Sequence, residues 1–199
     1  MLSVMDMGRF NACKNEQNVN KSKTYYKNAD AIEKVVRYIT RTRDNESRRN
    51  ELIYSGGSGV IIDAPIESII NQLKGVQSFY GIDSRKGRRL MHLVIGFTEN
   101  DFYQLNNDYA LVDLIGRETS AYFFALGFQN VYAVHHDQEK KVHIHICISS
   151  VNYITGLKIQ MDYEFNRALD KAVNTFFENA KVIAAENRGE ITEIEDLYN

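Results

Sequence analysis

The residues best suited to chemistry lie in the segment VHIHICI, residues 142–148, and just before it. Aliphatic residues alternate there with His143, His145 and Cys147, and this alternation predicts a β-strand with one apolar face. The opposite face would carry two imidazoles about 7 Å apart. Imidazoles bind divalent metals that accept nitrogen ligands, so this face is a candidate metal site. Cys147 is either a further ligand or a packing residue.

The preceding segment, VYAVHHDQEKK, predicts the other strand of a hairpin. If residues 139–141 form a three-residue loop, His135 lies opposite His145 and Asp137 lies opposite His143. This register collects four polar side chains on one face. Three imidazoles on one metal leave coordination positions open, which is typical of a catalytic site. The carboxylate would orient a ligand or act as a base.

A second register has a two-residue loop and places His136 opposite His143. The two registers exchange the faces of the strand, because a one-residue slip turns every side chain over. The first is favoured because it leaves only His136 among aliphatic residues. It makes His135 the third metal ligand, with His136 as the alternative. The competing interpretation is that His143 and His145 are exposed polar residues of an edge sheet.

Tyr38 is a candidate nucleophile. Residues 31–39 carry apolar side chains at helical spacing, and Tyr38 falls at the edge of their face, so that its ring packs while its hydroxyl reaches outward. Only about 0.1% of an ordinary tyrosine is ionised at pH 7, so attack requires a nearby cation or base. Arg37, Arg41 and Arg43 flank it in sequence. The alternative is an ordinary tyrosine at the boundary of the core.

These residues must be positioned by an α+β fold in which helices flank a central antiparallel sheet. The predicted strands cover residues 90–97, 129–136 and 142–151. The predicted helices cover residues 31–39, 65–74, 106–127 and 162–187. We expect residues 1–29 to be irregular and residues 43–59 to form a loop.

Composition favours one soluble domain. The chain has 199 residues, with 44% hydrophobic and 25% charged residues. It has no apolar window long enough for a membrane span and no signal-peptide core. Its two cysteines provide no disulfide framework, which favours a reducing cytoplasm.

The charge distribution is uneven although the net charge is only −2. Residues 21–50 contain nine Lys or Arg against four Asp or Glu, whereas residues 186–199 contain five Asp or Glu against one Arg. A basic front fits an anionic partner, and solvated surface is the alternative. The candidate backbone contacts for such a partner are Arg41, Arg43, Arg85, Lys86, Arg88 and Arg89.

Three segments resemble motifs of the HUH-type conjugative relaxases, most closely the mobilisation (MOBP) class. KVVRYITRTR is similar to their nucleophile segment, LMHLVIGFTEN to their middle strand motif, and HHDQEKKVHIHICISSVNYITG to their third motif. The motifs come in the family's order, and the resemblance covers roughly residues 25–175. It implies an antiparallel sheet that carries a divalent metal such as Mg or Mn, and a tyrosine on an overlying helix.

The resemblance also implies a function: site- and strand-specific nicking of DNA at a plasmid origin of transfer. Tyr38 would form a 5′-phosphotyrosine, and Asp137 would assist the removal of the tyrosine's proton. The implied partners are single-stranded DNA, accessory relaxosome proteins and a secretion coupling protein, and the implied location is the bacterial cytoplasm, with export alongside the transferred strand. The alternatives are a rolling-circle replication initiator of the HUH type and a non-catalytic DNA- or metal-binding protein.

Two features depart from the family pattern. In the family, the His-x-Asp element usually stands one residue closer to His-x-His. If Asp137 is matched to the family's Asp, the turn is one residue longer and His135 is the ligand. If the usual spacing is kept, His136 is the ligand and Gln138 stands in place of Asp. Gly96 stands where the middle motif commonly has Ser. His92 shares a face with Gly96, and it either lines the site or is a buried structural histidine.

The resemblance further implies a division of the chain. We expect residues 1–187 to form the nicking domain. The acidic residues 188–199 would be a frayed end or the start of a linker to a further C-terminal region.

Overall fold

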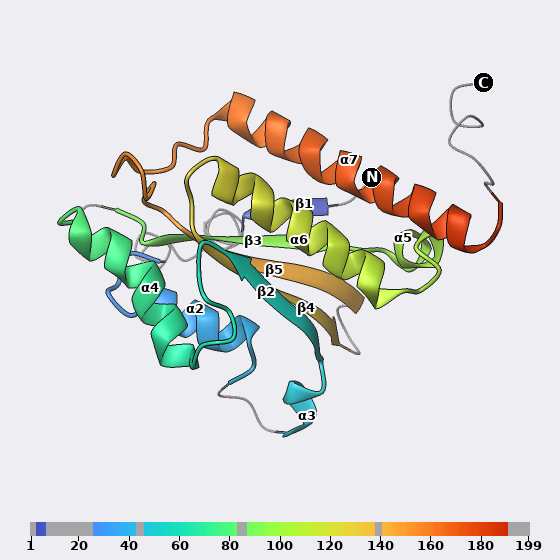
Figure 1. Ribbon diagram of the computed structural model, residues 1–199, viewed down its shortest axis with the longest axis horizontal. Helices are drawn as coiled ribbons and strands as arrows, with labels where there is room; N and C mark the ends of the chain where they lie inside the picture. Colours follow the sequence, from blue (N-terminus) through green and yellow to red (C-terminus); the bar gives the residue numbers. More distant parts are fainter. Residues whose placement is uncertain (1–2, 7–25, 43–45, 83–86, 138–140, 191–199) are drawn as a thin grey trace, which may run out of the picture.

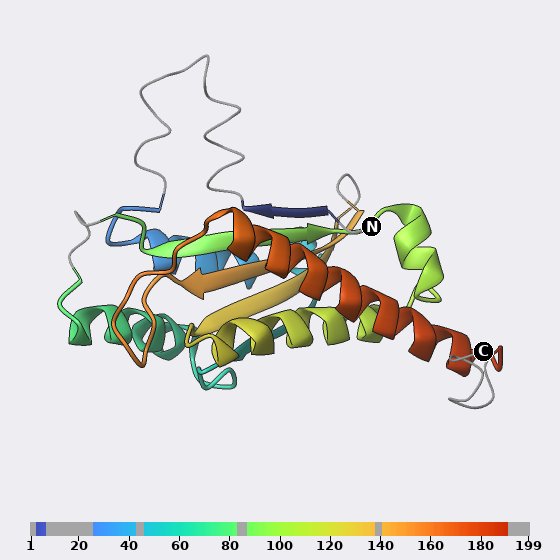
Figure 2. The same cartoon turned by 90° about the horizontal axis from the view of Figure 1, so that it is seen from above.

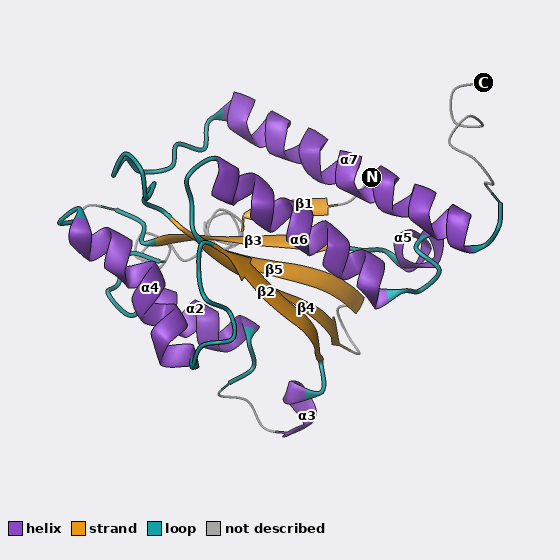
Figure 3. Ribbon diagram, viewed as in Figure 1, coloured by secondary structure: helices purple, strands orange, loops and turns teal. Residues whose placement is uncertain are grey.

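A five-stranded antiparallel sheet forms the centre of the molecule, in the order β1-β3-β5-β4-β2 (Figures 1 and 3). The computed structural model describes residues 3–6, 26–42, 46–82, 87–137 and 141–190. The strands are β1 (Ser3–Asp6), β2 (Leu52–Ser58), β3 (Leu90–Gly96), β4 (Asn130–Asp137) and β5 (Lys141–Ser149). This architecture confirms the predicted α+β fold.

Helices cover both faces of this sheet. Figure 2 shows the long helix α7 crossing the strands with α6 beside it, and α2 and α4 pack together on the opposite face. The helices are α2 (Ala31–Ile39), α3 (Glu46–Arg49), α4 (Ile66–Phe79), α5 (Glu99–Gln104), α6 (Tyr109–Ala125) and α7 (Tyr163–Asn187).

Strand alternation divides the apolar residues into two clusters. On the α6–α7 side, Ile144, Ile146 and Ile148 of β5 are fully buried in the larger cluster. On the α2–α4 side, the smaller cluster includes Val131 and Cys147. Cys147 is fully buried in this apolar cluster, where burial raises the pKa of its thiol to about 12, so the environment is that of a packing residue.

The hairpin formed by β4 and β5 has the predicted face but not the predicted register. His135 lies opposite His143, and Asp137 lies opposite Lys141, so both predicted registers are wrong. The observed pairing differs from the favoured one by two residues. Because side chains alternate with a period of two, this shift leaves each side chain on its predicted face.

Two segments predicted to be irregular contribute strands. Residues 43–59 include β2, and residues 1–29 include β1. Strand β2 was not predicted because its segment SGGS contains two glycines, and glycine is unfavourable in strands. A Cβ atom at Gly56 would stand 2.5 Å from the Tyr132 ring, so glycine is needed there for a close approach between the edge strand and β4.

The helix predictions differ mainly at the ends. Helix α4 continues to Phe79, beyond the predicted end at residue 74. Helix α6 begins three residues later than predicted, after Asp108 caps it, and Gly127 follows it with a φ of 90°. The short helix α5 was not predicted. Its signal was the capping box formed by Thr98 and Asp101.

Candidate active site

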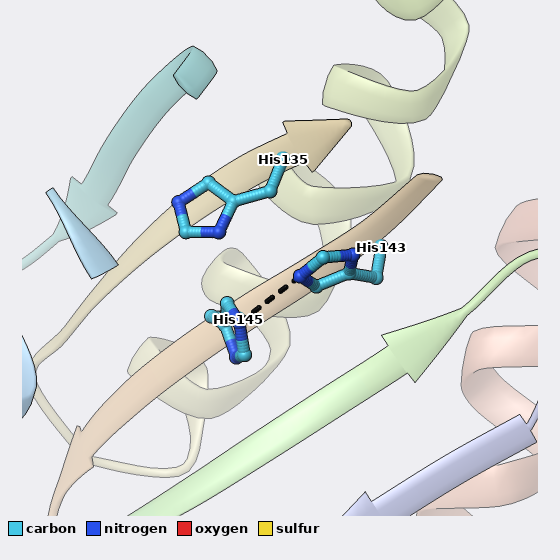
Figure 4. Close-up of side chains that lie close together, drawn as sticks. All are labelled: His135, His143 and His145. Atoms are coloured by element: carbon cyan, nitrogen blue, oxygen red, sulfur yellow. Dashed lines mark hydrogen bonds between the residues drawn. The ribbon is translucent and has the colours of Figure 1, made fainter. Parts of the chain in front are cut away.

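Three histidine side chains meet on the α2–α4 side of the sheet. His135 comes from β4, and His143 and His145 come from β5 (Figure 4). All three are buried, and each has a ring nitrogen within 4.8 Å of the others. The hairpin register explains this closeness, because His135 pairs directly with His143.

The geometry of His143 and His145 fits two ligands of one metal. Their Nε2 atoms lie 3.1 Å apart, whereas two nitrogens each about 2.1 Å from one ion stand roughly 3 to 3.4 Å apart. The opposite ring nitrogen of each is already held. His143 Nδ1 donates to the Lys141 carbonyl at 3.0 Å, and His145 Nδ1 lies 3.0 Å from His92 Nε2. Such contacts orient ligand imidazoles in metal sites.

His92 and Tyr26 extend this arrangement outward. His92 is buried on β3, a diagonal neighbour of His145, and its Nδ1 lies 2.9 Å from the Tyr26 hydroxyl. The sequence left open whether His92 lines the site or is a buried structural histidine, and the structure shows it buried and in contact with His145. The contact made by Tyr26 was not foreseen, since residues near it carry no periodic pattern.

The third imidazole, His135, is held from two sides. Its Nε2 donates to the Ile39 carbonyl at 2.6 Å, and its Nδ1 accepts from Arg41 Nη2 at 3.3 Å. These contacts assign the ring proton to Nε2, because a guanidinium can only donate. Nδ1 is therefore the nitrogen with a lone pair, and the Arg41 guanidinium lies against it.

The environment keeps the imidazoles of His135 and His145 neutral. Burial is the main cause that lowers the pKa of His135 to about 3. Burial, followed by the neighbouring His92 and His143, holds the pKa of His145 well below its usual value. A neutral imidazole is the form that binds a metal. An imidazole with a pKa near 3 is a weak base at neutral pH, so His135 is better suited to ligation than to proton transfer.

Tyr38 lies beside this cluster. It is in the last turn of α2, 37% exposed, and its ring centre stands 5.4 Å from that of His145 and 6.3 Å from that of His92. The helix places it there because its buried apolar residues, among them Val35 and Ile39, pack against the sheet. The aromatic ring is thus partly buried while one side of it remains open to solvent.

His136 and Asp137 occupy different positions relative to the cluster. His136 is exposed on the other side of β4, where its Nδ1 is hydrogen-bonded to the Tyr109 hydroxyl. The alternative ligand is therefore directed away from the three histidines. Asp137 is half-buried at the end of β4, on the face of His135, and its charge acts on that imidazole.

The candidate DNA contacts that the structure describes have different environments. Arg43, Arg85 and Lys86 lie outside the described residues. Arg88 is half-buried with its guanidinium 6.0 Å from the Tyr26 ring. Arg89 donates to Gln77 and to the Ile82 carbonyl, so its guanidinium is used within the fold. Arg41 is only 3% exposed, which places it inside the candidate site and not along a surface path.

Fold and cluster together define a centre suited to metal-assisted chemistry beside a partly exposed tyrosine. The sequence matches the MobA/VirD2-like relaxase family, nuclease domain, over residues 38–180. This match spans more than half of the chain, and the protein belongs to that family. No curated protein sequence matches the chain.

The family membership confirms that the chain is a relaxase, as the motifs indicated. The matched region begins at Tyr38 and includes the three clustered histidines. The protein is therefore a relaxase nuclease domain, of a class that nicks DNA in conjugative mobilisation and binds single-stranded DNA. Among the residues that the structure describes, no helix is long and apolar enough to cross a membrane.

Proposed function

We propose that this protein nicks one strand of DNA at a plasmid origin of transfer by transesterification. The Tyr38 hydroxyl oxygen attacks the scissile phosphorus and forms a 5′-phosphotyrosine. The bond from phosphorus to the 3′ oxygen breaks, and that oxygen leaves and takes up a proton. The ester conserves the bond energy, so the reverse attack by the 3′-OH rejoins the strand.

The observation that carries this proposal is the proximity of Tyr38 to the histidine cluster. About a hundred residues separate them in sequence, yet the rings of Tyr38 and His145 stand 5.4 Å apart. Nucleophilic catalysis needs an activated group held next to the reacting centre. A tyrosine that served only as boundary packing would have no need to lie beside buried imidazoles.

His135, His143 and His145 would hold a divalent metal such as Mg or Mn. When bound, the ion supplies a positive charge that polarises a phosphate oxygen. His135 and His145 contribute by remaining neutral, and the hydrogen bonds on the far nitrogens of His143 and His145 keep these two rings in place. His135 would use Nδ1, which accepts from Arg41 in this structure, so Arg41 would give up that hydrogen bond when the ion is bound. Three nitrogen ligands also suit softer divalent ions. The ligand set therefore does not select one particular ion.

The other residues support binding and proton movement. Asp137 is proposed to assist loss of the tyrosine's proton, because it shares the face of His135 and its charge reaches that ring. Arg88, together with Arg43, Arg85 and Lys86, would contact the phosphate backbone, a contribution that weakens with salt. Accessory relaxosome proteins and a coupling protein are proposed as partners.

We also propose that residues 1–187 make up the nicking domain and that the acidic tail is dispensable. Helix α7 ends at Asn187, and the residues after it are largely polar and acidic. Removal of residues 188–199 should leave the nicking rate within about twofold of the full chain. Abolished nicking by a truncated protein with an unchanged circular dichroism spectrum would contradict this division.

The test of the proposed function is the covalent intermediate. Labelled single-stranded oligonucleotides that tile the DNA beside the gene would be incubated with the protein and Mn²⁺, and the products separated on a denaturing gel. We expect one oligonucleotide to yield a protein–DNA adduct, and peptide mass spectrometry to place it on Tyr38.

The matched controls are Tyr38→Phe and Tyr26→Phe. Each removes one hydroxyl next to the histidines and leaves the ring. We expect the first to form no adduct while it binds DNA normally, and the second to retain adduct formation. If Tyr38→Phe forms the adduct and Tyr26→Phe does not, the nucleophile is Tyr26.

A further inference from the structure

Arg41 stands in a backbone conformation that favours glycine. Two backbone hydrogen bonds close the C-terminal end of helix α2. The Thr42 amide donates to the Arg37 carbonyl at 3.2 Å, and the Arg41 amide donates to the Tyr38 carbonyl at 3.3 Å. This Schellman ending places Arg41 in the left-handed region, with a φ of 54°. A side chain there is strained relative to glycine.

The strained residue is also buried and charged. Arg41 is 3% exposed, and its Nη2 lies 3.0 Å from Glu51 Oε2 and 3.3 Å from His135 Nδ1. Its guanidinium carbon stands 5.0 Å from the centre of the Tyr38 ring. One guanidinium thus contacts the proposed nucleophile and a proposed metal ligand at the same time.

A buried charge and a strained backbone are both unfavourable, and such features persist where surrounding structure or function maintains them. A surface contact to DNA would require neither of them. An ion pair with Glu51 alone would not require the left-handed turn, which brings the side chain back to Tyr38, three residues earlier.

We propose that Arg41 is a positioning residue for the nicking reaction. Its guanidinium holds the Tyr38 ring beside the histidine cluster through a cation–π contact. The same guanidinium lies 3.3 Å from His135 Nδ1 and 3.0 Å from Glu51 Oε2, so the cluster and Glu51 together set its place against the Tyr38 ring. This inference rests on the proposed function of Tyr38, and it adds a residue that couples the nucleophile to the third histidine.

The deciding variant is Arg41→Gly, because glycine accepts the left-handed conformation. Glu51 is partly exposed and can be solvated when its partner is lost. We expect a melting temperature within a few degrees of the wild type, and an affinity for the oligonucleotide within about threefold. The single-turnover rate of adduct formation at saturating DNA should fall by about 100-fold, as expected when a nucleophile is misplaced by roughly 1 Å.

Arg37→Ala is the matched control. Arg37 precedes Tyr38 in the same helix and is ion-paired with Glu33 and Glu67. Its loss should lower the melting temperature and leave the adduct rate within about threefold. The opposite pattern, a destabilised Arg41→Gly with a wild-type rate, would make Arg41 a purely structural residue and overturn the inference.

Chemical rescue of the adduct rate distinguishes a positioning role from a purely structural one. Millimolar ethylguanidinium should restore at least tenfold of the rate lost in Arg41→Gly and nothing in Tyr38→Phe. A reduced rate in Arg41→Gly that ethylguanidinium does not restore would count against the positioning role.

The inference can be separated from the proposed function by ¹⁹F NMR of 3-fluorotyrosine at Tyr38. If the wild type forms no adduct, the nicking proposal fails. Arg41→Gly should still shift or broaden the Tyr38 resonance, because the ring loses its guanidinium contact. A resonance identical to that of the wild type would refute positioning by Arg41, whatever the adduct assay shows.

Discussion

The two faces of the β4–β5 hairpin are both buried, but they carry different kinds of residues. On the α6–α7 face, Ile144, Ile146 and Ile148 are buried among aliphatic and aromatic side chains. On the other face, apolar packing under α2 and α4 covers one part, and the histidine cluster occupies another. The contrast shows that one face supplies stability while the other is free to hold polar groups.

His135 and His136 show the same contrast at two adjacent residues. His135 is fully buried, hydrogen-bonded on both ring nitrogens and close to two other imidazoles. His136 is exposed and bonded to Tyr109 at the edge of the opposite layer. Chain neighbours on a strand therefore differ in chemistry because they point to different faces.

The largest expected effect tests this pair directly. His135→Ala should lower Mn²⁺ affinity by about 1,000-fold, because the loss of a ligand exceeds the roughly 10–100-fold cost of losing an outer partner. His136→Ala should change it by less than about threefold. Calorimetric titration of both variants makes the comparison, and a greater loss in His136→Ala would reverse the assignment.

The next effect belongs to the apolar face. Ile144→Ala should reduce the free energy of unfolding by about 3 kcal/mol, since it leaves a cavity in a fully buried cluster. Mn²⁺ affinity should stay within about threefold under conditions where the variant is folded. Urea denaturation combined with titration would show this, and a large affinity loss at full folding would mean that the two faces are not independent.

A change of pH should act on the histidine face. The pKa of His135 is lowered to about 3 in the folded protein, and an unfolded histidine titrates near 6.5. Between these values the unfolded chain binds more protons, so stability present above pH 6.5 is lost as the pH falls toward 3. In the presence of a chelator, the shift from pH 7 to pH 5 should cost about 2 kcal/mol from this residue.

Urea denaturation at the two pH values measures this loss. His136→Ala, which removes an exposed imidazole, should show the same dependence as the wild type. Equal stability at pH 7 and pH 5 would indicate that His135 is protonated in the fold, and the neutral-ligand argument would then fail.

The smallest effect concerns the contact behind His145. His92→Leu should weaken Mn²⁺ binding by about tenfold. The His145 ring loses the partner that holds its Nδ1, while its Nε2 remains available to the ion. Tyr26→Phe, one contact further out, should have a smaller effect. A stronger effect for Tyr26→Phe than for His92→Leu would show that the two do not act through His145.

Local pattern determined much of the site. Alternation in VHIHICI was sufficient to place His143 and His145 on one face, whereas the sequence only favoured His135 over His136 as their partner on β4. The register itself was beyond the sequence, because it depends on the length of the turn, whereas a two-residue slip leaves the apolar face buried. Helical spacing likewise placed Tyr38 at the edge of its helix but not beside any particular strand.

Other features were decided by tertiary contacts alone. The edge strand β2 was not predicted from SGGS. Gly56 is needed there because the Tyr132 ring lies too close for a larger residue, and Tyr132 lies far along the chain. The position of Arg41 looked like that of a surface residue in a basic segment. Only the left-handed end of α2 and the approach of Glu51 and His135 bury it. Sequence therefore determined which side chains of one strand or helix share a face, since that follows from backbone periodicity. The packing of helix α2 on the sheet decided which faces meet, because long-range contacts have no local signature.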